Sequence, residues 1–254
     1  MRYWLWLSGV LHGDLGQSIQ AKQPVADLLR PAVVVTAELV LYAGLLTVVI
    51  GVALGVLGGL RRGVVDGGVI VTTTVSAAIP AFVASVVLML VFGTNLGWFP
   101  VNGMTAGSGL LDRLWVLTLP AVALAISSMA VVARITRASV REEERKEHVQ
   151  TAISRGIPYR KVVQRHVMRN ASIPIVTVAA LTVASLIAVA AVVEQAFNLR
   201  GVGFYLIAGA NNKDFAVVQA ASLVLVFAFV IANTLVDVLY AFLDPRVTLG
   251  ARAT

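Results

Sequence analysis

Side chains capable of catalysis are few in this sequence and do not gather into a recognisable site. The sequence contains no cysteine, which excludes disulfides, thiolate metal sites and a cysteine nucleophile. Its three histidines, His12, His148 and His166, are too scattered to predict a metal cluster. The phosphate-loop pattern G-x-x-x-x-G-K-[ST] and the patterns H-E-x-x-H and G-x-S-x-G are absent, and Gly201 and Gly203 lack the third glycine of a dinucleotide fingerprint. We therefore expect a non-catalytic chain that binds no metal or cofactor itself.

The charged residues concentrate in residues 141–170, whose sequence REEERKEHVQTAISRGIPYRKVVQRHVMRN separates two long apolar segments. Pro158 fits the first turn of a helix, and the spacing after it predicts one helical face formed by Tyr159, Val162, Val163, His166 and Val167. A second helix is predicted over 142–154, with one face formed by Val149, Ala152 and Ile153. Gly156, between the two helices, suits a left-handed helix end. We call residues 142–167 the elbow.

Two roles fit a basic, amphipathic elbow. It could lie as a surface hairpin against anionic lipid headgroups, with its apolar face toward the bilayer. It could instead fit into a groove on a partner protein. Sequence pattern and charge alone favour neither role over the other.

The rest of the sequence must position the elbow, and its composition predicts a membrane protein. The 254 residues are 58% hydrophobic and 13% charged, whereas soluble domains are about one quarter charged. A spanning helix needs roughly 20 apolar residues, and five segments qualify, at about 33–60, 69–92, 115–132, 173–196 and 215–243. All five should be α-helical, because backbone in lipid must satisfy its hydrogen bonds within its own segment. The net charge of +7 is attributed to topology, and no nucleic-acid partner is expected.

The basic residues also orient these spans. If Arg61, Arg62, residues 134–170 and the C-terminus share one side of the membrane, that side carries 14 of the 20 Lys and Arg residues. The positive-inside rule then makes the elbow and the C-terminus cytoplasmic and the N-terminus external. We expect residues 1–32 to form an external or interfacial segment and residues 33–254 to form the transmembrane domain.

Small residues in the first predicted span indicate how the helices pack. Gly51, Gly55, Gly58 and Gly59 form small-xxx-small patterns. Such patterns let two helices approach closely within a membrane. We therefore predict a tight helix–helix contact along this part of the chain.

A proline and three acids lie within or beside the spans. Pro80 interrupts the second span, where neighbouring helices could accommodate it or where it could form a kink that lines a pathway. Glu38, Glu194 and Asp237 all lie near span ends, where a charge costs less than at the bilayer centre. For Glu38 and Asp237 we expect packing or interfacial roles, whereas Glu194 adjoins an external turn and could face a substrate entrance. Pro80, Glu194 and Asn198 are our candidates for the pathway.

The elbow and the segment after it, QTAISRGIPYRKVVQRHVMRNASIPIV (150–176), resemble the cytoplasmic coupling loop, or EAA loop, of bacterial ABC importer permeases. The match is to the dipeptide and oligopeptide (peptide/nickel) branch, with a T-A…G core, a basic helix, R-N-A and a proline. These are Thr151, Ala152, Gly156, residues 169–171 and Pro174. Gln150 occupies the position of the loop's glutamate, a departure that this branch commonly has.

The resemblance covers essentially the whole chain. Residues 9–29 resemble the family's external segment, and residues 77–92 and 96–103 resemble its proline-bearing helix and exit loop. The stretch VVEQAFNLRGVGFYLIAGANNKDFAVVQA (192–220) resembles the pattern V-E…F…G-x-G…D-x-P-V-V-Q, with Ala216 in place of the proline. Residues 233–247 resemble the last helix and tail. Members of the family usually begin with one more transmembrane helix, which we expect to be missing here.

This resemblance implies an all-α type I permease fold with five transmembrane helices in this chain, placed in a bacterial inner membrane. It implies a coupling loop over 139–172, with contact to an ATPase through Gln150, Thr151, Ala152, Arg155, Gly156, Ile157, Pro158 and Tyr159. The implied partners are a second homologous permease, two cytoplasmic ABC ATPase domains that bind ATP and Mg²⁺, and an extracytoplasmic peptide-binding protein. The implied cargo is a dipeptide or oligopeptide. A nickel or glutathione permease and an ATP-independent secondary transporter remain as alternatives.

Overall fold

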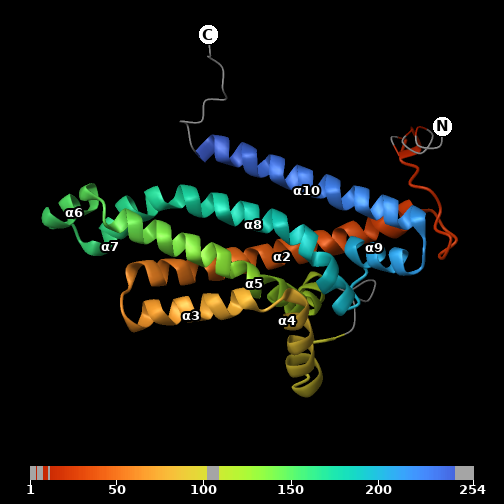
Figure 1. Cartoon of the computed structure of the whole chain (residues 1–254), viewed down its shortest axis with the longest axis horizontal. Coiled ribbons are helices and arrows are strands. Elements are labelled where there is room, and N and C mark those ends of the chain that lie inside the picture. Colours follow the sequence, from red (N-terminus) through yellow and green to blue (C-terminus); the bar gives the residue numbers. More distant parts are fainter. Residues whose placement is uncertain (1–3, 5–7, 11, 102–108, 244–254) are drawn as a thin grey trace, which may run out of the picture. The chain divides into compact units, whose positions relative to one another are not determined.

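The computed structural model describes residue 4 and residues 8–10, 12–101 and 109–243, and these residues are predominantly helical (Figure 1). Among these residues, Gln17 and Pro24 form an isolated antiparallel β-bridge. The helices follow in the order α2 (Val25–Leu60), α3 (Val64–Ala78), α4 (Ala81–Leu88), η1 (Met89–Asn95, π-helical), α5 (Leu110–Glu144), α6 (Glu147–Ser154), α7 (Tyr159–Val162), η2 (Val163–Val167, π-helical), α8 (Met168–Ala196), α9 (Val202–Asn211) and α10 (Phe215–Leu243).

Among the described residues, four helices are long and apolar enough to cross a bilayer, and a fifth span results if the bent pair α3 and α4–η1 is counted as one. The prediction of one helix over 69–92 is therefore wrong in its detail. The helix stops at Ala78, and Ile79 adopts extended backbone with φ −89° and ψ 112°. Proline disfavours helical backbone in the residue before it, so Pro80 explains the break.

The predicted helix ends also differ from the observed ones. α2 begins at Val25, inside the segment 1–32 that was expected to precede the transmembrane domain. Asp27 lies in its first turn, where the helix dipole favours an acid. The third span was expected to reach into the Arg134/Arg137 region, but α5 continues to Glu144. It thereby includes the start of the helix predicted over 142–154, and α6 begins only at Glu147. α10 matches the predicted span 215–243.

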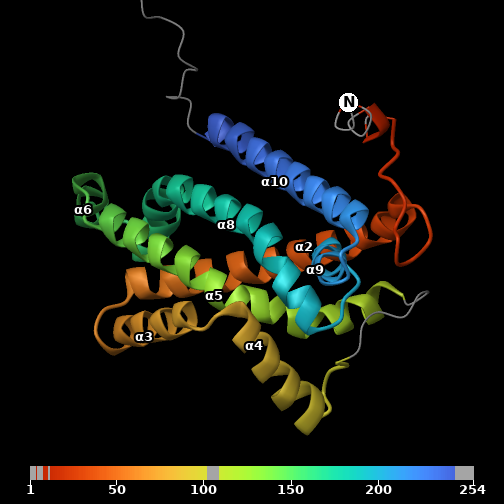
Figure 2. The same cartoon turned by 45° about the vertical axis from the view of Figure 1, so that its right-hand side comes forward.

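The described residues divide into two compact units, and α2, α5, α8 and α10 each contribute to both. The first unit comprises residues up to Ala43, Ala81–Leu124 and Ser185–Val230. In its core, α9 lies beside the beginnings of α2 and α10 (Figures 1 and 2). The buried side chains of this cluster are Val25, Leu29 and Ala32 of α2, Val202 of α9, and Val217, Ala220 and Ala221 of α10.

The second unit comprises Gly44–Pro80, Ala125–Ala184 and the residues from Ile231 onward. It contains the elbow, the second half of α2, all of α3, and the adjoining parts of α5 and α8. Its buried cluster is formed by Val140, Val149, Ala152, Val162, Val167, Ala171 and Ile175, with Val52, Val56 and Leu60 of α2 packed against it. The elbow is therefore part of a packed body. The C-terminus, predicted to be cytoplasmic, and the tail residues 244–247 lie outside the described residues.

Candidate docking elbow and its supports

The tip of the elbow is a helix end followed by a sharp turn, as the sequence predicts. α6 ends at Ser154, and Gly156 adopts a left-handed φ of +74°. The Gly156 N–H donates to Ile153 O at 2.9 Å, and the Ile157 N–H donates to Ala152 O at 3.3 Å. These two bonds form a Schellman helix end, whose left-handed residue is usually glycine. Pro158 then precedes α7, and its carbonyl accepts from the Lys161 N–H at 2.8 Å.

Most of the residues predicted to contact an ATPase lie on the surface of the elbow. The exposed ones are Gln150, Thr151, Arg155, Gly156, Pro158 and Tyr159. Ile157 is half-buried, and Ala152 is buried in the core beneath the tip. The tip thus offers a polar and basic surface with an aromatic ring, while contact with an ATPase remains a prediction for all eight residues.

The inner faces of the two elbow helices agree with the prediction except at two residues, Ile153 and Tyr159, of which Tyr159 is 48% exposed. Val149 and Ala152 of α6 are buried, as is Val162 in α7. Ile153, which was expected to face inward, is 40% exposed. α6 spans only about two turns, so its core contact is narrow and excludes the residue next to Ala152.

Two consecutive glutamates at the end of α5, among the first residues of the elbow, bind the rest of the elbow and the start of α8 through polar contacts. Glu143 is buried and its carboxylate accepts from Asn170 Nδ2 of α8 at 2.8 Å, while Lys146 Nζ lies 2.6 Å from its other oxygen. This bond to Glu143 raises the pKa of Lys146 above its ordinary value. Glu144 accepts from the Tyr159 hydroxyl at 2.6 Å. Sequence reasoning did not single out these glutamates, although the R-N-A pattern contains Asn170.

The predicted glycine contact is confirmed as a seam between the second half of α2 and α5. A Cβ at Gly51 would lie 2.8 Å from Val132 Cβ, and one at Gly59 would lie 2.8 Å from Val140 Cγ1. A Cβ at Gly55 would lie 2.6 Å from the backbone oxygen of Ala133. These distances leave no room for a side chain, so the two helix backbones are in direct contact. The seam reaches Val140, which belongs to the core beneath the elbow.

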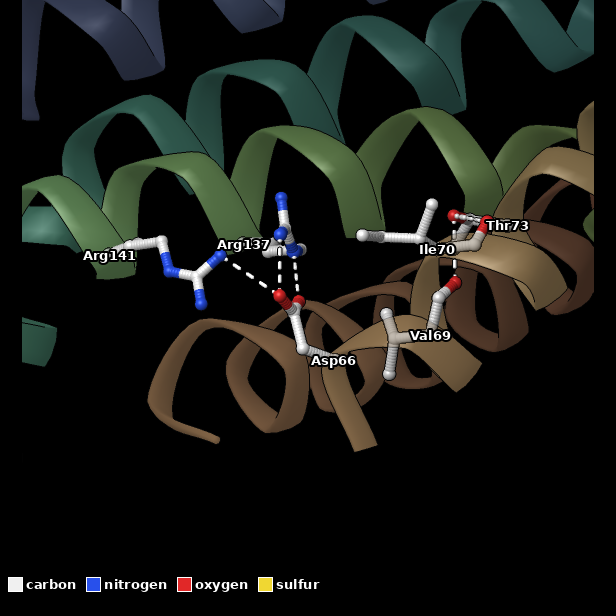
Figure 3. A network of polar contacts seen from close by, with 6 residues as sticks. All are labelled: Asp66, Val69, Ile70, Thr73, Arg137 and Arg141. Atoms are coloured by element: carbon white, nitrogen blue, oxygen red, sulfur yellow. Dashed lines mark hydrogen bonds and ion pairs between the residues drawn. The ribbon is translucent and has the colours of Figure 1, made fainter. Parts of the chain in front are cut away.

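α3 joins the same body through an acid that sequence reasoning missed. Asp66, in the first turn of α3, accepts from Arg137 Nε at 2.5 Å and from Arg137 Nη2 at 2.9 Å (Figure 3). Its Oδ2 also accepts from Arg141 Nη1 at 3.0 Å. Arg137 and Arg141 were counted only as topology determinants, because their partner lies in a different helix, far from them in the sequence.

The three pathway candidates belong to different units, and each is described within its own unit. Pro80 is exposed at the end of the second unit, whereas Glu194 and Asn198 belong to the first. Asn198 is exposed and left-handed, with φ 52°, and forms a second Schellman end, in which the Leu199 N–H donates to Glu194 O at 2.9 Å. Its position is explained by this helix end, and a pathway role for all three remains a prediction.

Glu194 is fully buried and both of its carboxylate oxygens have partners. Thr36 Oγ1 of α2 donates to one oxygen at 2.6 Å, and the Phe204 N–H at the start of α9 donates to the other at 3.0 Å. Thr36 in turn accepts from the Val202 N–H at 2.9 Å. A substrate could reach Glu194 only if these bonds opened. The carboxylate also fills the space that a Cβ at Gly201 would occupy, which explains the first glycine of the G-x-G pattern.

A second buried acid in the first unit anchors the N-terminal segment that precedes α2. Ser18 Oγ donates to Asp214 Oδ2 at 2.6 Å, and the Gln20 N–H donates to the same oxygen at 3.2 Å. Burial acts to raise the pKa of Asp214, but the hydrogen bonds from Ser18 and from nearby backbone N–H groups outweigh it and lower this pKa below its ordinary value. Asp214 is the aspartate of the D-x-P-V-V-Q pattern, which could have pointed to it.

The long apolar helices and the fold define a multi-pass membrane protein. The chain belongs to the family described as binding-protein-dependent transport system inner membrane component, which matches residues 51–249. Among solved structures, a chain of the MetNI methionine ABC transporter in inward-facing conformations matches with a TM-score of 0.71 at 17% identity, covering 85% of this chain and 96% of that chain. This likeness concerns the fold, and it confirms the predicted type I permease fold.

Curated relatives match along nearly the whole chain. The chain is 33% identical over 252 residues to the oligopeptide transport system permease protein of Bacillus subtilis (strain 168), covering 97% of this chain and 80% of that protein. It is 30% identical over 269 residues to the dipeptide transport system permease protein of Alkalihalophilus pseudofirmus, covering 97% and 81%. It is 33% identical over 247 residues to the glutathione transport system permease protein of Escherichia coli O6:H1, covering 97% and 78%.

Proposed function

We propose that this chain is the permease subunit of an ATP-driven importer of dipeptides or oligopeptides, and that the elbow is where an ATPase acts on it. The observation that carries this proposal is the structure of the elbow itself. Its tip exposes polar, basic and aromatic side chains, while its inner face is buried against α2, α5 and α8. A surface hairpin held only by lipid would not need these contacts.

The proposed mechanism follows from how the elbow is held. Residues 150–159 insert into a groove on a cytoplasmic ATPase domain, and closure of the ATPase pair displaces them. The buried cluster, the glycine seam and the bonds of Glu143 and Glu144 transmit this displacement from the elbow tip to the rest of the second unit. The helices of that unit then change the opening of the transport pathway. In this account the permease has two conformations, and ATP binding by the partner shifts their populations.

The chemistry of the cycle belongs to other chains. Two ATPase domains bind ATP and Mg²⁺ and hydrolyse the nucleotide, a second homologous permease supplies the other half of the pathway, and an external peptide-binding protein delivers the cargo. The charge distribution supports a cytoplasmic elbow and C-terminus in a bacterial inner membrane. The names of the relatives favour peptides as cargo, and the glutathione relative keeps a small modified peptide as the second candidate.

Site-specific cross-linking tests the docking directly, because the sequence contains no cysteine. Arg155→Cys places a thiol on the exposed tip, and Lys213→Cys places one on an exposed residue of the first unit as the matched control. We expect Arg155→Cys, but not Lys213→Cys, to cross-link to a co-expressed ATPase. Equal cross-linking of both variants, or of neither, would contradict docking at the elbow.

Transport measurements separate the proposed importer from a secondary transporter. In proteoliposomes that contain the assembled complex and the binding protein, peptide uptake should require ATP. Uptake driven by an ion gradient without ATP would support the alternative. Uptake of glutathione in preference to unmodified dipeptides would change the cargo but leave the mechanism intact.

A further inference from the structure

Asp66 of α3 and the two arginines Arg137 and Arg141 of α5 form a contact that we call the joint. Asp66 receives three hydrogen bonds from two arginines, and one of these arginines binds both of its oxygens (Figure 3). The side chain of Asp66 is 13% exposed, and those of Arg137 and Arg141 are 24% and 23% exposed. Two-pronged arginine–carboxylate pairs fix geometry as well as charge. At this degree of burial the pairing restrains how α3 lies against α5.

The two arginines lie on the part of α5 that supports the elbow. Val140, between them, is buried in the core beneath the elbow. Glu143 and Glu144, which bond Asn170 and Tyr159, follow directly. The last two turns of α5 therefore connect α3 on one side with the elbow on the other.

α3 also packs closely against α2 near the same joint. A Cβ at Gly58 of α2 would lie 3.2 Å from Val69 Cβ of α3 and 3.2 Å from Arg137 Cδ. The buried hydroxyl of Thr73, in contrast, donates to Val69 and Ile70 within α3 itself (Figure 3). The bonds of Asp66 thus supply a directional polar link to α5, and the contact at Gly58 supplies packing. At its other end α3 stops at Ala78, immediately before the break at Pro80.

We propose that Asp66 is a positioning residue of the transport cycle, which makes α3 move together with the elbow and so carries the ATPase-driven displacement to the break at Pro80. This inference rests on the proposed docking of the elbow. It adds an element that the elbow's own sequence does not indicate, because α4, η1 and most of α5 lie between α3 and the coupling loop in the sequence. Without the joint, the elbow would still bind the ATPase, but α3 would no longer follow it.

The first test replaces the carboxylate by an amide of the same shape. In the assembled complex, Asp66→Asn should leave ATPase binding and ATP hydrolysis close to wild type. Peptide uptake per ATP hydrolysed should fall by roughly fivefold or more, the lower end of the range for coupling between sites. The control is Glu38→Gln, which removes an acid–arginine ion pair in the first unit, where Arg113 Nη2 lies 2.6 Å from Glu38 Oε2. Glu38→Gln should leave the uptake-to-hydrolysis ratio unchanged.

The second test links α3 covalently to the second half of α2, which itself contacts α5 along the glycine seam. Gly58→Cys with Val69→Cys would place the two Cβ atoms 3.2 Å apart, slightly less than the roughly 3.5–4.5 Å of a disulfide, so the bond requires α2 and α3 to separate by a few tenths of an ångström. In the Asp66→Asn background, oxidation of this pair should bring the uptake-to-hydrolysis ratio back toward wild type, and a reductant should lower it again. Thermal unfolding in detergent identifies conditions in which the variants are equally stable. Under those conditions, a change of the uptake-to-hydrolysis ratio with redox state cannot be explained by destabilisation alone.

The outcomes separate this inference from the function on which it rests. A normal uptake-to-hydrolysis ratio in Asp66→Asn, with impaired uptake in an elbow variant, would overturn the role of Asp66 and leave the docking of the elbow standing. Loss of ATPase binding in Asp66→Asn would also overturn it, because the residue would then shape the elbow itself. A reduced uptake-to-hydrolysis ratio that the disulfide does not restore would contradict the proposal that Asp66 makes α3 move together with the elbow.

Discussion

Gly156 offers the sharpest prediction about the elbow, because its backbone conformation disfavours a side chain whereas its surroundings leave room for one. Its φ of +74° lies in the left-handed region, yet a Cβ built there would meet no atom within 4 Å. A side chain would therefore cost backbone strain alone, with no steric clash. For an L-residue in the left-handed region this cost is about 1–2 kcal/mol. That corresponds to roughly a 5–30-fold shift away from the observed turn.

A graded series at Gly156 uses this separation. Asparagine tolerates left-handed backbone, whereas alanine and especially valine do not. We expect uptake per ATP hydrolysed to stay near wild type in Gly156→Asn, to fall in Gly156→Ala, and to fall furthest in Gly156→Val. Each variant would be assayed in proteoliposomes with its ATPase and binding protein, and membrane insertion would be checked by protein yield. Valine should leave insertion intact.

Two results would refute this reasoning. Wild-type coupling in Gly156→Val would show that the turn is not required for transmission. An asparagine variant as impaired as the valine variant would show that the glycine is needed for close contact with a partner surface and not for its backbone conformation.

Two further predictions concern helix packing and the contact of Asp214 with the N-terminal segment. Gly55→Ala should destabilise the chain by about 1–3 kcal/mol, the usual cost of overpacking, because its Cβ would overlap Thr136. Gly67→Ala is the control and should not destabilise the chain, because its Cβ meets nothing within 4 Å. Equal thermal unfolding of the two variants would contradict the glycine seam. Because the folded-state pKa of Asp214 is lowered, its contribution to stability is fully present above the ordinary aspartate pKa of about 4 and is lost as the pH falls through the lowered value. Ser18→Ala should reduce this acid-dependent part of the unfolding free energy, and an unchanged pH profile would argue against the anchor.

Local signals in the sequence predicted the parts of the fold that depend on local physics. Runs of apolar residues located the spans, and the glycine pattern predicted the seam of α2 with α5. Gly156 and Pro158 predicted the helix end and the new helix start at the elbow tip. In each case the residue type restricts its own backbone or its immediate contact, so neighbouring residues in the sequence are enough.

The missed features depend on partners far apart in the sequence. Nothing near Asp66 indicates that Arg137 will bind it, and nothing near Glu143 indicates Asn170. Glu194 is a similar case, because its partner Thr36 lies in another helix. We expected Glu194 near an entrance, but it is fully buried. The boundary between α5 and the elbow helix was likewise misplaced, because hydropathy does not show that residues 142–144 continue α5 and that the new helix starts at Glu147.

The most direct test of the account is hydrogen exchange of the elbow in the permease alone and in the complex with its ATPase. Backbone amides of residues 150–159 should exchange more slowly when the ATPase is bound, while those around the Ser18–Asp214 contact should not change. Protection of residues 150–159 by vesicles of anionic lipid, with no further protection from the ATPase, would contradict docking at the elbow.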